Sequence, residues 1–401
     1  MSFPSPTALG KFIVLAGMAV GFAACSGSSS PSPVAYPPPG SFPTTYGLMS
    51  IITPPKTGSF DIGFVDETAH MYLLADRSTN GIDVVDSLAS KFLGTAGAGQ
   101  FSGLGTAVPG FTRNPNAGPN GVVSLGGGLA AAGDGNSTLK IVNFTTITPT
   151  VVASISVPNP YTGPALGPGI CQPQPPAGPD LGTPTVGAGN FRVDEMAYDP
   201  TDNVIVAVSD NSCPVFMTFF QGTAPYTILH QTALLTANGG GEQPVWDPTQ
   251  GKFLVAIPST TVHPNGEIEV SDPKTFANTA IGLPLSCGPS GMALGKNETV
   301  VTACGNDSSM KTWNAVTFAA LNSAPGPSPD EVYYSPGSNR FYGGDTGGGT
   351  LAVLDGSGSL LARTPTCSGS HSVAVESLND HVFVPVNATC AATEGINIFD
   401  H

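Results

Sequence analysis

One pattern of apolar and turn residues recurs along the chain and constrains the fold more than any other feature. Each copy has a short apolar strand, a turn often built on Asp-Pro or Asn, a second apolar strand, and a third strand that ends in Asp or Asn. Apolar runs of about four to eight residues between such turns are typical of β-strands. Three clear copies begin at residues 194, 242 and 330, and weaker copies begin at residues 61, 120, 290 and 371.

The spacing of these copies predicts a seven-bladed β-propeller of four-stranded antiparallel blades. The later copies begin 40 to 48 residues apart, which matches the roughly 40–50 residues of one blade. Insertions rich in Gly and Pro, near residues 96–118 and 158–190, account for the longer steps. The last copy has only three strands, so the strand-like segment 46–52 is expected to add the missing outer strand and close the ring. A β-sandwich is the alternative architecture.

The composition agrees with an all-β fold and argues against some classes of binding partner. The 401 residues include 51 Gly and 39 Pro, and only 10% are charged, which favours short strands joined by many turns. The 13 basic and 28 acidic residues give a formal net charge of −15. Nucleic acid is not an expected partner, because its phosphates require clustered Lys and Arg. An anionic membrane surface is excluded on the same ground.

The N-terminal 24 residues resemble a bacterial lipoprotein signal peptide. The apolar run at residues 12–24 follows Lys11, and it is shorter than the ~20 residues that a membrane-spanning helix needs. The run ends in Phe-Ala-Ala-Cys at residues 22–25, which resembles a lipobox. We therefore expect lipidation of Cys25 and anchorage to a membrane by the lipid alone. Cleavage of an ordinary secretory signal after Ala24 is the alternative.

A tether and the folded domain follow the predicted lipidation site. Residues 25–41 are rich in Ser, Pro and Gly and lack apolar periodicity, so they are predicted not to pack. The propeller is predicted over residues 42–401. Ser26, and not Asp, follows the cysteine, which by analogy with lipoprotein sorting favours the outer membrane of a cell envelope, on its periplasmic or surface face.

The cysteines indicate disulfides and therefore export. Two pairs are symmetric about the turns of predicted hairpins, an arrangement that brings Cα atoms within the range a disulfide tolerates. The expected pairs are Cys287–Cys304, Cys367–Cys390 and, by exclusion, Cys171–Cys213. A thiolate metal site is the alternative, but no CxxC or Cys/His pair has the spacing of metal ligands.

The hairpins resemble those of a known propeller class. Asp-Pro turns followed by five apolar residues, as at Asp199-Pro200, and third strands of the form Ile-x-Val-x-Asp are similar to those of the NHL/YVTN class of β-propellers. That class includes the regucalcin/gluconolactonase family. The resemblance covers roughly residues 46–401 and implies the architecture. It implies little about function, because propellers serve both as binding scaffolds and as unrelated enzymes.

A column of polar residues appears when the copies are aligned on their turns. In the propeller class this position begins the innermost strand and borders one mouth of the axial channel. The column contains Asp61, Asn120, Asp194, Glu242, Ser290, Asp330 and His371. These groups form either a hydrated rim around a water-filled channel or a site for a polar ligand, Ca²⁺ or another divalent cation.

Two functions from different classes remain open. Motifs for covalent haem, phosphate loops, zinc helices and nucleophile elbows are absent from the sequence. The favoured hypothesis is a lipid-anchored cell-envelope scaffold that binds an unidentified ligand or protein. The alternative is a metal-dependent hydrolase of lactonase type. Resemblance to the gluconolactonase family implies that Glu242, Asn120 and either Asp194 or Asp61 would then hold the cation.

The two tryptophans, Trp246 and Trp313, both lie among apolar neighbours on predicted strands. We interpret both as packing within the blades. An aromatic wall for a ligand is the alternative interpretation.

Overall fold

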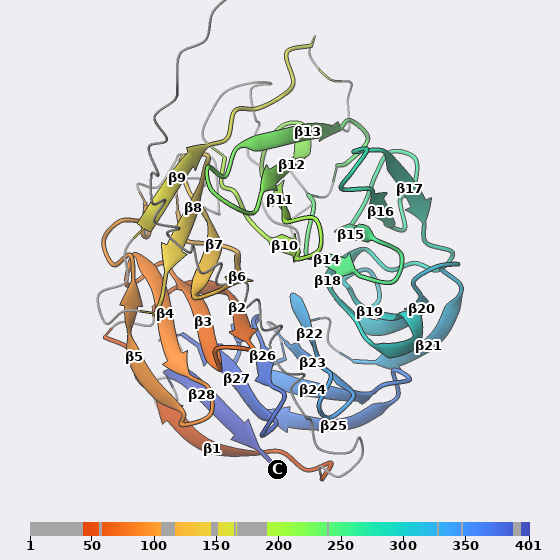
Figure 1. Ribbon diagram of the computed structural model, residues 1–401. Helices are drawn as coiled ribbons and strands as arrows, with labels where there is room; N and C mark the ends of the chain where they lie inside the picture. Colours follow the sequence, from red (N-terminus) through yellow and green to blue (C-terminus); the bar gives the residue numbers. More distant parts are fainter. Residues whose placement is uncertain are drawn as a thin grey trace, which may run out of the picture. The chain divides into compact units, whose positions relative to one another are not determined.

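The computed structural model has seven four-stranded antiparallel sheets arranged around one axis (Figure 1). It describes residues 43–55, 58–105, 117–145, 151–163, 166, 191–238, 240–326, 329–345, 348–387 and 394–401. The predicted seven-bladed propeller is confirmed, and a β-sandwich is excluded. The helical content of the described residues is one 3₁₀ turn, η1 (Lys296–Glu298). None of their helices is long and apolar enough to cross a bilayer.

The first three blades each use four consecutive strands, ordered from the axis outward. Blade 1 contains β2 (Phe60–Asp66), β3 (Met71–Asp76), β4 (Gly81–Asp86) and β5 (Lys91–Ala96). Blade 2 contains β6 (Val122–Gly126), β7 (Leu129–Asp134), β8 (Thr138–Asn143) and β9 (Val151–Ser156). Blade 3 contains β10 (Met196–Asp199), β11 (Val204–Ser209), β12 (Val215–Gln221) and β13 (Ile228–Leu234).

The next three blades repeat this order. Blade 4 contains β14 (Pro244–Asp247), β15 (Lys252–Ile257), β16 (Glu267–Ser271) and β17 (Asn278–Gly282). Blade 5 contains β18 (Pro289–Leu294), β19 (Thr299–Cys304), β20 (Ser309–Asn314) and β21 (Ala320–Pro325). Blade 6 contains β22 (Glu331–Ser335), β23 (Arg340–Gly344), β24 (Thr350–Asp355) and β25 (Leu360–Pro365).

Blade 7 is built from both ends of the described chain. From the axis outward, its strands are β26 (Ala374–Glu376), β27 (His381–Val386), β28 (Gly395–Asp400) and β1 (Gly47–Ile52). β1 pairs antiparallel with β28, so that Gly47 lies opposite Asp400 and Ile52 lies opposite Ile396. Figure 1 shows β1 on the outer side of β28. The predicted closure by an N-terminal outer strand is therefore confirmed.

The Asp that ends several inner strands shapes the hairpin that follows it. In blade 3, Asp199 Oδ1 accepts hydrogen bonds from the backbone N–H groups of Thr201 (2.7 Å) and Asp202 (3.3 Å). Asp247 makes the equivalent pair of bonds in blade 4. Such turns often need a residue in the left-handed region, and Asn203, with a φ of 55°, takes that position before β11. The recurring Asp and Asn of the sequence pattern are thus explained by turn geometry.

Apolar contacts between blades hold the sheets together. Within the described residues, seven buried apolar clusters each combine two neighbouring blades. Between blades 3 and 4, for example, the rings of Phe219 and Phe253 lie 6.3 Å apart. Because β11 faces a neighbouring blade on both sides, all six of its residues are buried. The outer strand β9 instead alternates half-buried and exposed residues.

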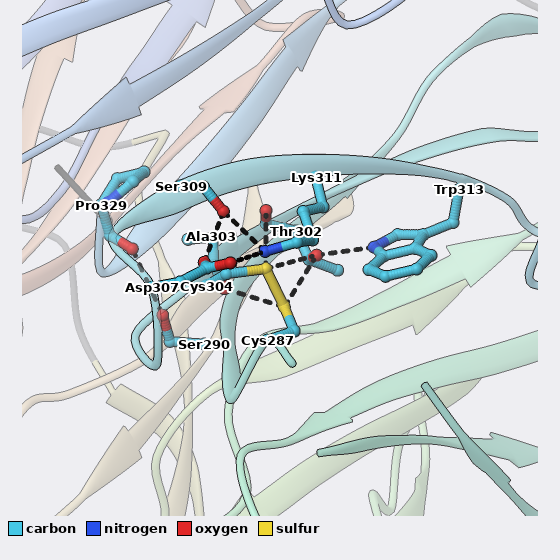
Figure 2. Close-up of a disulfide and its surroundings, with 10 residues drawn as sticks. All are labelled: Cys287, Ser290, Thr302, Ala303, Cys304, Asp307, Ser309, Lys311, Trp313 and Pro329. Carbon is cyan, nitrogen blue, oxygen red and sulfur yellow. Dashed lines mark hydrogen bonds and ion pairs between the residues drawn. A yellow bond between two sulfur atoms is a disulfide. The ribbon is translucent and has the colours of Figure 1, made fainter. Parts of the chain in front are cut away.

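A disulfide joins Cys287 to Cys304 at the start of blade 5, with their Cα atoms 4.3 Å apart (Figure 2). This pair is confirmed, but the register used to predict it is not. The ladder places Cys304 opposite Pro289, and its register shifts between Pro289 and Met292. The hairpin turn lies at η1, one to two residues later than expected, because that irregularity adds length to the first strand.

Cys213 and Cys367 are also disulfide-bonded. Their expected partners, Cys171 and Cys390, lie outside the described residues, so these two pairings stay predictions. The expected signal peptide at 1–24, the lipidation site Cys25 and the tether at 25–41 lie outside the described residues as well.

Tyr46, just before β1, anchors the closing segment to blades 6 and 7. Its hydroxyl donates to Asp380 Oδ2 (2.6 Å), accepts from Arg340 Nη1 (2.5 Å) and lies 2.9 Å from the hydroxyl of Tyr342. Burial, followed by the neighbouring Asp380 carboxyl, raises the pKa of Tyr46 above its ordinary value, so the hydroxyl keeps its proton. This buried network ties the closing segment to blades 6 and 7.

Replacing Tyr46 with Phe tests this network. We expect Tyr46→Phe to lower the free energy of unfolding by about 1–3 kcal/mol, because buried polar groups lose a hydrogen-bond partner. Urea denaturation followed by circular dichroism measures the change. Tyr226→Phe is the matched control, because this buried tyrosine lies outside the network. An equal loss in the two variants would contradict a special role for Tyr46.

Candidate functional site

The seven polar positions predicted from the sequence lie at the starts of the inner strands. Asp61 and Ser290 are the second residues of β2 and β18, and the other five precede their inner strands by one to three residues. Four of them, Asp61, Asn120, Asp194 and His371, share contacts on the side of blades 1, 2, 3 and 7. Ser290 instead donates from Oγ to the carbonyl oxygen of Pro329 (3.3 Å).

Arg192, which the sequence analysis did not single out, lies at the centre of these contacts. It precedes β10 and is 5% exposed. Its Nη2 lies 2.6 Å from Asp194 Oδ2, and its Nε and Nη2 donate to the two oxygens of Asp210 at 3.2 and 2.9 Å. Nη1 lies 3.9 Å from Asp61 Oδ2. One guanidinium therefore serves three buried carboxyl groups.

A second arginine, Arg77, joins blade 1 to blade 2 at the same mouth. Its Nη2 donates to Asp61 Oδ2, and its Nε and Nη2 donate to Asn120 Oδ1 at 3.1 and 2.8 Å. On the other side of Asp61, His371 Nε2 lies 3.3 Å from Oδ1. The His371 ring stacks on Phe60, with centroids 5.2 Å apart. Asp61 is thus enclosed by three nitrogen-bearing side chains.

These neighbours decide the protonation of the carboxyl groups. Burial alone would raise the pKa of Asp61, but Arg77, His371 and Arg192 together lower it below its ordinary value. Burial raises the pKa of Asp194, and the nearby carboxyl groups of Asp210 and Asp61 oppose the lowering by Arg192. The neighbouring carboxylates raise the pKa of Arg192 well above its ordinary value despite its burial. The two arginines stay charged and supply the cations that this acidic mouth requires.

The mouth does not fit a divalent cation. Calcium sites present six to eight oxygen ligands to the ion, whereas the oxygens of Asp61, Asn120 and Asp194 face guanidinium groups. Within the described residues, no group of three or more His, Cys, Asp or Glu side chains could hold a metal ion. No chemistry based on a metal is therefore derived for Glu242, Asn120, Asp194 or Asp61.

A cavity of about 420 Å³ lies farther along the same inner strands. Residues of β2, β6, β10, β14, β18 and β22 line it, and these strands surround the axis in Figure 1. The lining includes Ile62, Glu195 and Gln243, each of which follows a predicted mouth residue, but none of the mouth residues themselves. Pro200, in the hairpin turn after β10, lines it as well. The cavity therefore extends from the middle of the channel toward the turns between inner and second strands.

Five aromatic side chains line this cavity, and we call them the aromatic wall: Phe64, Tyr198, Trp246, Tyr333 and Tyr334. Tyr198 and Tyr334 donate from their hydroxyls to Asn203 Oδ1 (2.9 Å) and Asn339 Oδ1 (2.7 Å) in their own hairpin turns. These bonds fix the direction of both rings. The wall is therefore held by the scaffold.

The two tryptophans have different environments. Trp313 is fully buried within blade 5, and its Nε1 donates to Thr302 Oγ1 (2.8 Å) beside the disulfide (Figure 2). Its interpretation as packing is confirmed. Trp246 packs on Phe253 at 5.0 Å but also lines the cavity. The packing predicted for Trp246 is present. The side chain also lines the cavity, because β14 is an inner strand.

Three polar side chains lie at the level of the inner strands just below the mouth. Gln243 Oε1 accepts from the N–H groups of Met292 (2.7 Å) and Val332 (3.1 Å), so this amide links blade 4 to blades 5 and 6. Glu331 Oε2 accepts from Ser372 Oγ (2.9 Å). Glu195 is 6% exposed and lines the cavity. Burial, followed by nearby acidic groups, raises the pKa of both glutamates well above the ordinary value.

Comparison with known proteins supports the propeller fold. No protein-family model and no curated protein matches the chain. A solved chain from "Crystal Structure of Mitotic Checkpoint Complex" is similar, with a TM-score of 0.59 and 12% sequence identity over 94% of this chain and 98% of that chain. At this identity the likeness shows the propeller fold alone.

Removing the central arginine of the mouth tests its role. We expect Arg192→Met to lower the free energy of unfolding by about 3–5 kcal/mol at pH 7, because buried carboxylates lose their counter-charge. The loss should shrink between pH 7 and 5. A carboxyl whose pKa is higher in the folded than in the unfolded state takes up a proton on folding, so acid favours the folded variant. Thermal unfolding across this pH range measures both effects.

A surface ion pair provides the control for this variant. Lys274 Nζ lies 3.1 Å from Asp202 Oδ2, and the lysine side chain is 67% exposed. Exposed pairs contribute little, so Lys274→Met should leave stability nearly unchanged at both pH values. A small effect of Arg192→Met, similar to that of Lys274→Met, would show that the mouth does not depend on this guanidinium.

Proposed function

We propose that this protein is a lipid-anchored β-propeller of the cell envelope that binds a ligand in its axial cavity. The cavity carries the proposal. Its volume of about 420 Å³ falls within the ~300–1,000 Å³ of pockets for small molecules. Aromatic and aliphatic side chains line most of it, with a few polar groups, which is the usual composition of such pockets. An exposed peptide segment of a partner protein would use the same cavity.

The location in the cell envelope rests on the chain's N-terminus and cysteines. The lipobox-like sequence before Cys25 and the Ser/Pro/Gly tether favour a folded domain held away from a membrane by a lipid. The disulfide between Cys287 and Cys304 supports an oxidising compartment, because cytosolic thiols are kept reduced. Assignment to the NHL/YVTN class is part of the same proposal and rests on the Asp-Pro turns and the terminal strands.

A lactonase activity is not proposed. Its metal would need the oxygens at the mouth, and those oxygens face Arg77 and Arg192. The binding function needs no such ion.

Filling the cavity tests the binding function. Leu294 of β18 lines the cavity, and Leu294→Trp should occupy part of it. The neutral fluorescent probe N-phenyl-1-naphthylamine is expected to bind the wild-type protein saturably and at least tenfold more weakly to Leu294→Trp. Leu321→Trp, at a site that is 56% exposed on the outer strand β21, should bind like the wild type. Probe that does not bind the wild type saturably, or binds all three proteins equally, would refute the proposal.

Removing the lipidated cysteine tests the anchor. Cys25→Ala in the full chain should leave the membrane fraction and stop incorporating a labelled fatty acid, because the acyl chains provide the membrane affinity. Cell fractionation and fatty-acid labelling measure this, with Cys213→Ala as the control that keeps the label. A Cys25→Ala protein that stays in the membrane fraction would contradict lipid anchorage.

A further inference from the structure

A buried acidic side chain at the cavity wall has an oxygen without a hydrogen-bond partner in the described part of the chain. Glu195 lines the axial cavity and is 6% exposed, and its Oε2 has no hydrogen-bond partner among the described residues. A buried carboxyl that lacks a partner is costly to the folded state, and most buried polar side chains in proteins are satisfied. Such a group at the wall of a cavity points to a ligand that pairs with it.

Further acidic groups surround Glu195. Glu331 is 2% exposed; its Oε2 is bonded to Ser372, but its Oε1 has no partner among the described residues. Glu331, Glu242 and Asp330 all lie close enough to raise the cost of ionising Glu195. The lining of the cavity contains no Lys, Arg or His from the described part of the chain. The local field therefore favours a positive charge that the lining does not supply.

The two arginines nearest the cavity are paired at the mouth. Arg192 and Arg77 pair with Asp61, Asp194 and Asp210 at the mouth, and none of these five residues lines the cavity. At the neighbouring mouth, the buried carboxyl groups are thus paired with arginines of the same chain. At Glu195 the corresponding cation is absent from the residues that line the cavity.

The aromatic wall lies in the same cavity as Glu195. Aromatic ring faces attract cations within about 6 Å. They also bury the apolar body of a ligand. Phe64 and Tyr333 meet edge to face with centroids 6.3 Å apart, and Trp246 adds an indole. An acidic group and aromatic rings in one cavity lining are the two elements that recognise an ammonium group on an apolar body.

We propose that the axial cavity binds an organic ammonium cation, with the charged nitrogen at Glu195 and the apolar body against the aromatic wall. This proposal rests on the proposed function, because it names the ligand class of the same cavity. A neutral apolar ligand would leave Glu195 Oε2 without a partner. An anion would face the Glu195 carboxyl with no Lys, Arg or His in the described lining to balance its charge. A hydrated metal ion would lose its waters against a mostly aromatic and aliphatic surface.

A matched set of probes tests the charge requirement. Benzyltrimethylammonium, 2-phenylethylamine and neutral 2-phenylethanol have similar apolar bodies and differ in charge. Calorimetry on the disulfide-bonded protein should show at least one of the two cations binding at least tenfold more tightly than the alcohol. Glu195→Gln keeps the shape of the side chain and should remove most of this preference. Glu269→Gln, at a buried glutamate of β16 outside the cavity lining, should retain it.

A second variant and a peptide complete the test. Glu331→Gln should weaken cation binding in the same direction, so the proposal stays testable even if Glu195→Gln folds poorly. A free amine and a lysine side chain share this chemistry. A blocked peptide with one central lysine therefore separates the two sources. Tight binding by the peptide alone would support the proposal and assign the cation to a protein partner.

Four outcomes would overturn the proposed cation selectivity, and only the last would also refute the proposed function. If 2-phenylethanol binds as tightly as the cations, or if Glu195→Gln keeps the full preference, the cavity does not select positive charge. The same conclusion follows if no cation and no peptide binds while N-phenyl-1-naphthylamine does. In these cases the proposed ligand-binding function remains. Failure of every probe, including the naphthylamine, would refute both proposals.

Discussion

The antiparallel pairing of β1 with β28 is the contact on which the rest of the propeller depends. An open array of seven blades would leave β28 with an unpaired edge and the first and last blades without a shared core. Pairing of Gly47–Ile52 with Gly395–Asp400 removes that edge. It also brings blade 7 against blade 1, where Phe383 stacks on Tyr72 at 4.7 Å. The inner strands, and the cavity between them, keep their positions because the ring is closed.

The fold was predictable from local signals, whereas much of the site was not. Turn residues Asp and Asn recur at a regular spacing, with apolar runs between them. Both signals arise from the local backbone structure of a single blade. The missing strand of the last copy even identified residues 46–52 as the closing strand. Contacts between side chains of different blades at the axis produce no regular spacing in the sequence. Arg192 and Arg77 stand outside the aligned column, and nothing in their sequence surroundings indicates that they meet Asp61 from two different blades.

The alignment also located the polar mouth without locating the cavity. Just before β10, a step of one residue leads from Asp194, whose carboxyl pairs with an arginine, to Glu195, whose carboxyl lies on the cavity wall. A single sequence cannot separate these two environments, because both residues are acidic and adjacent. Similarly, the symmetry of Cys287 and Cys304 gave the correct pair through a turn position that was off by one to two residues, because an irregularity in β18 does not alter the pattern of apolar residues.

The closure by β1 has a consequence for how the chain reaches its native state. The β1–β28 ladder joins segments from the two ends of the described sequence, and contacts between such distant segments form slowly. Until β28 is available, β1 has no strand to pair with and one edge of β27 is uncovered. A partly synthesised chain therefore exposes aggregation-prone strand edges. We therefore expect the ring to be completed late in folding. In the folded protein, the closing segment then covers an edge of β28 that could otherwise pair with another chain.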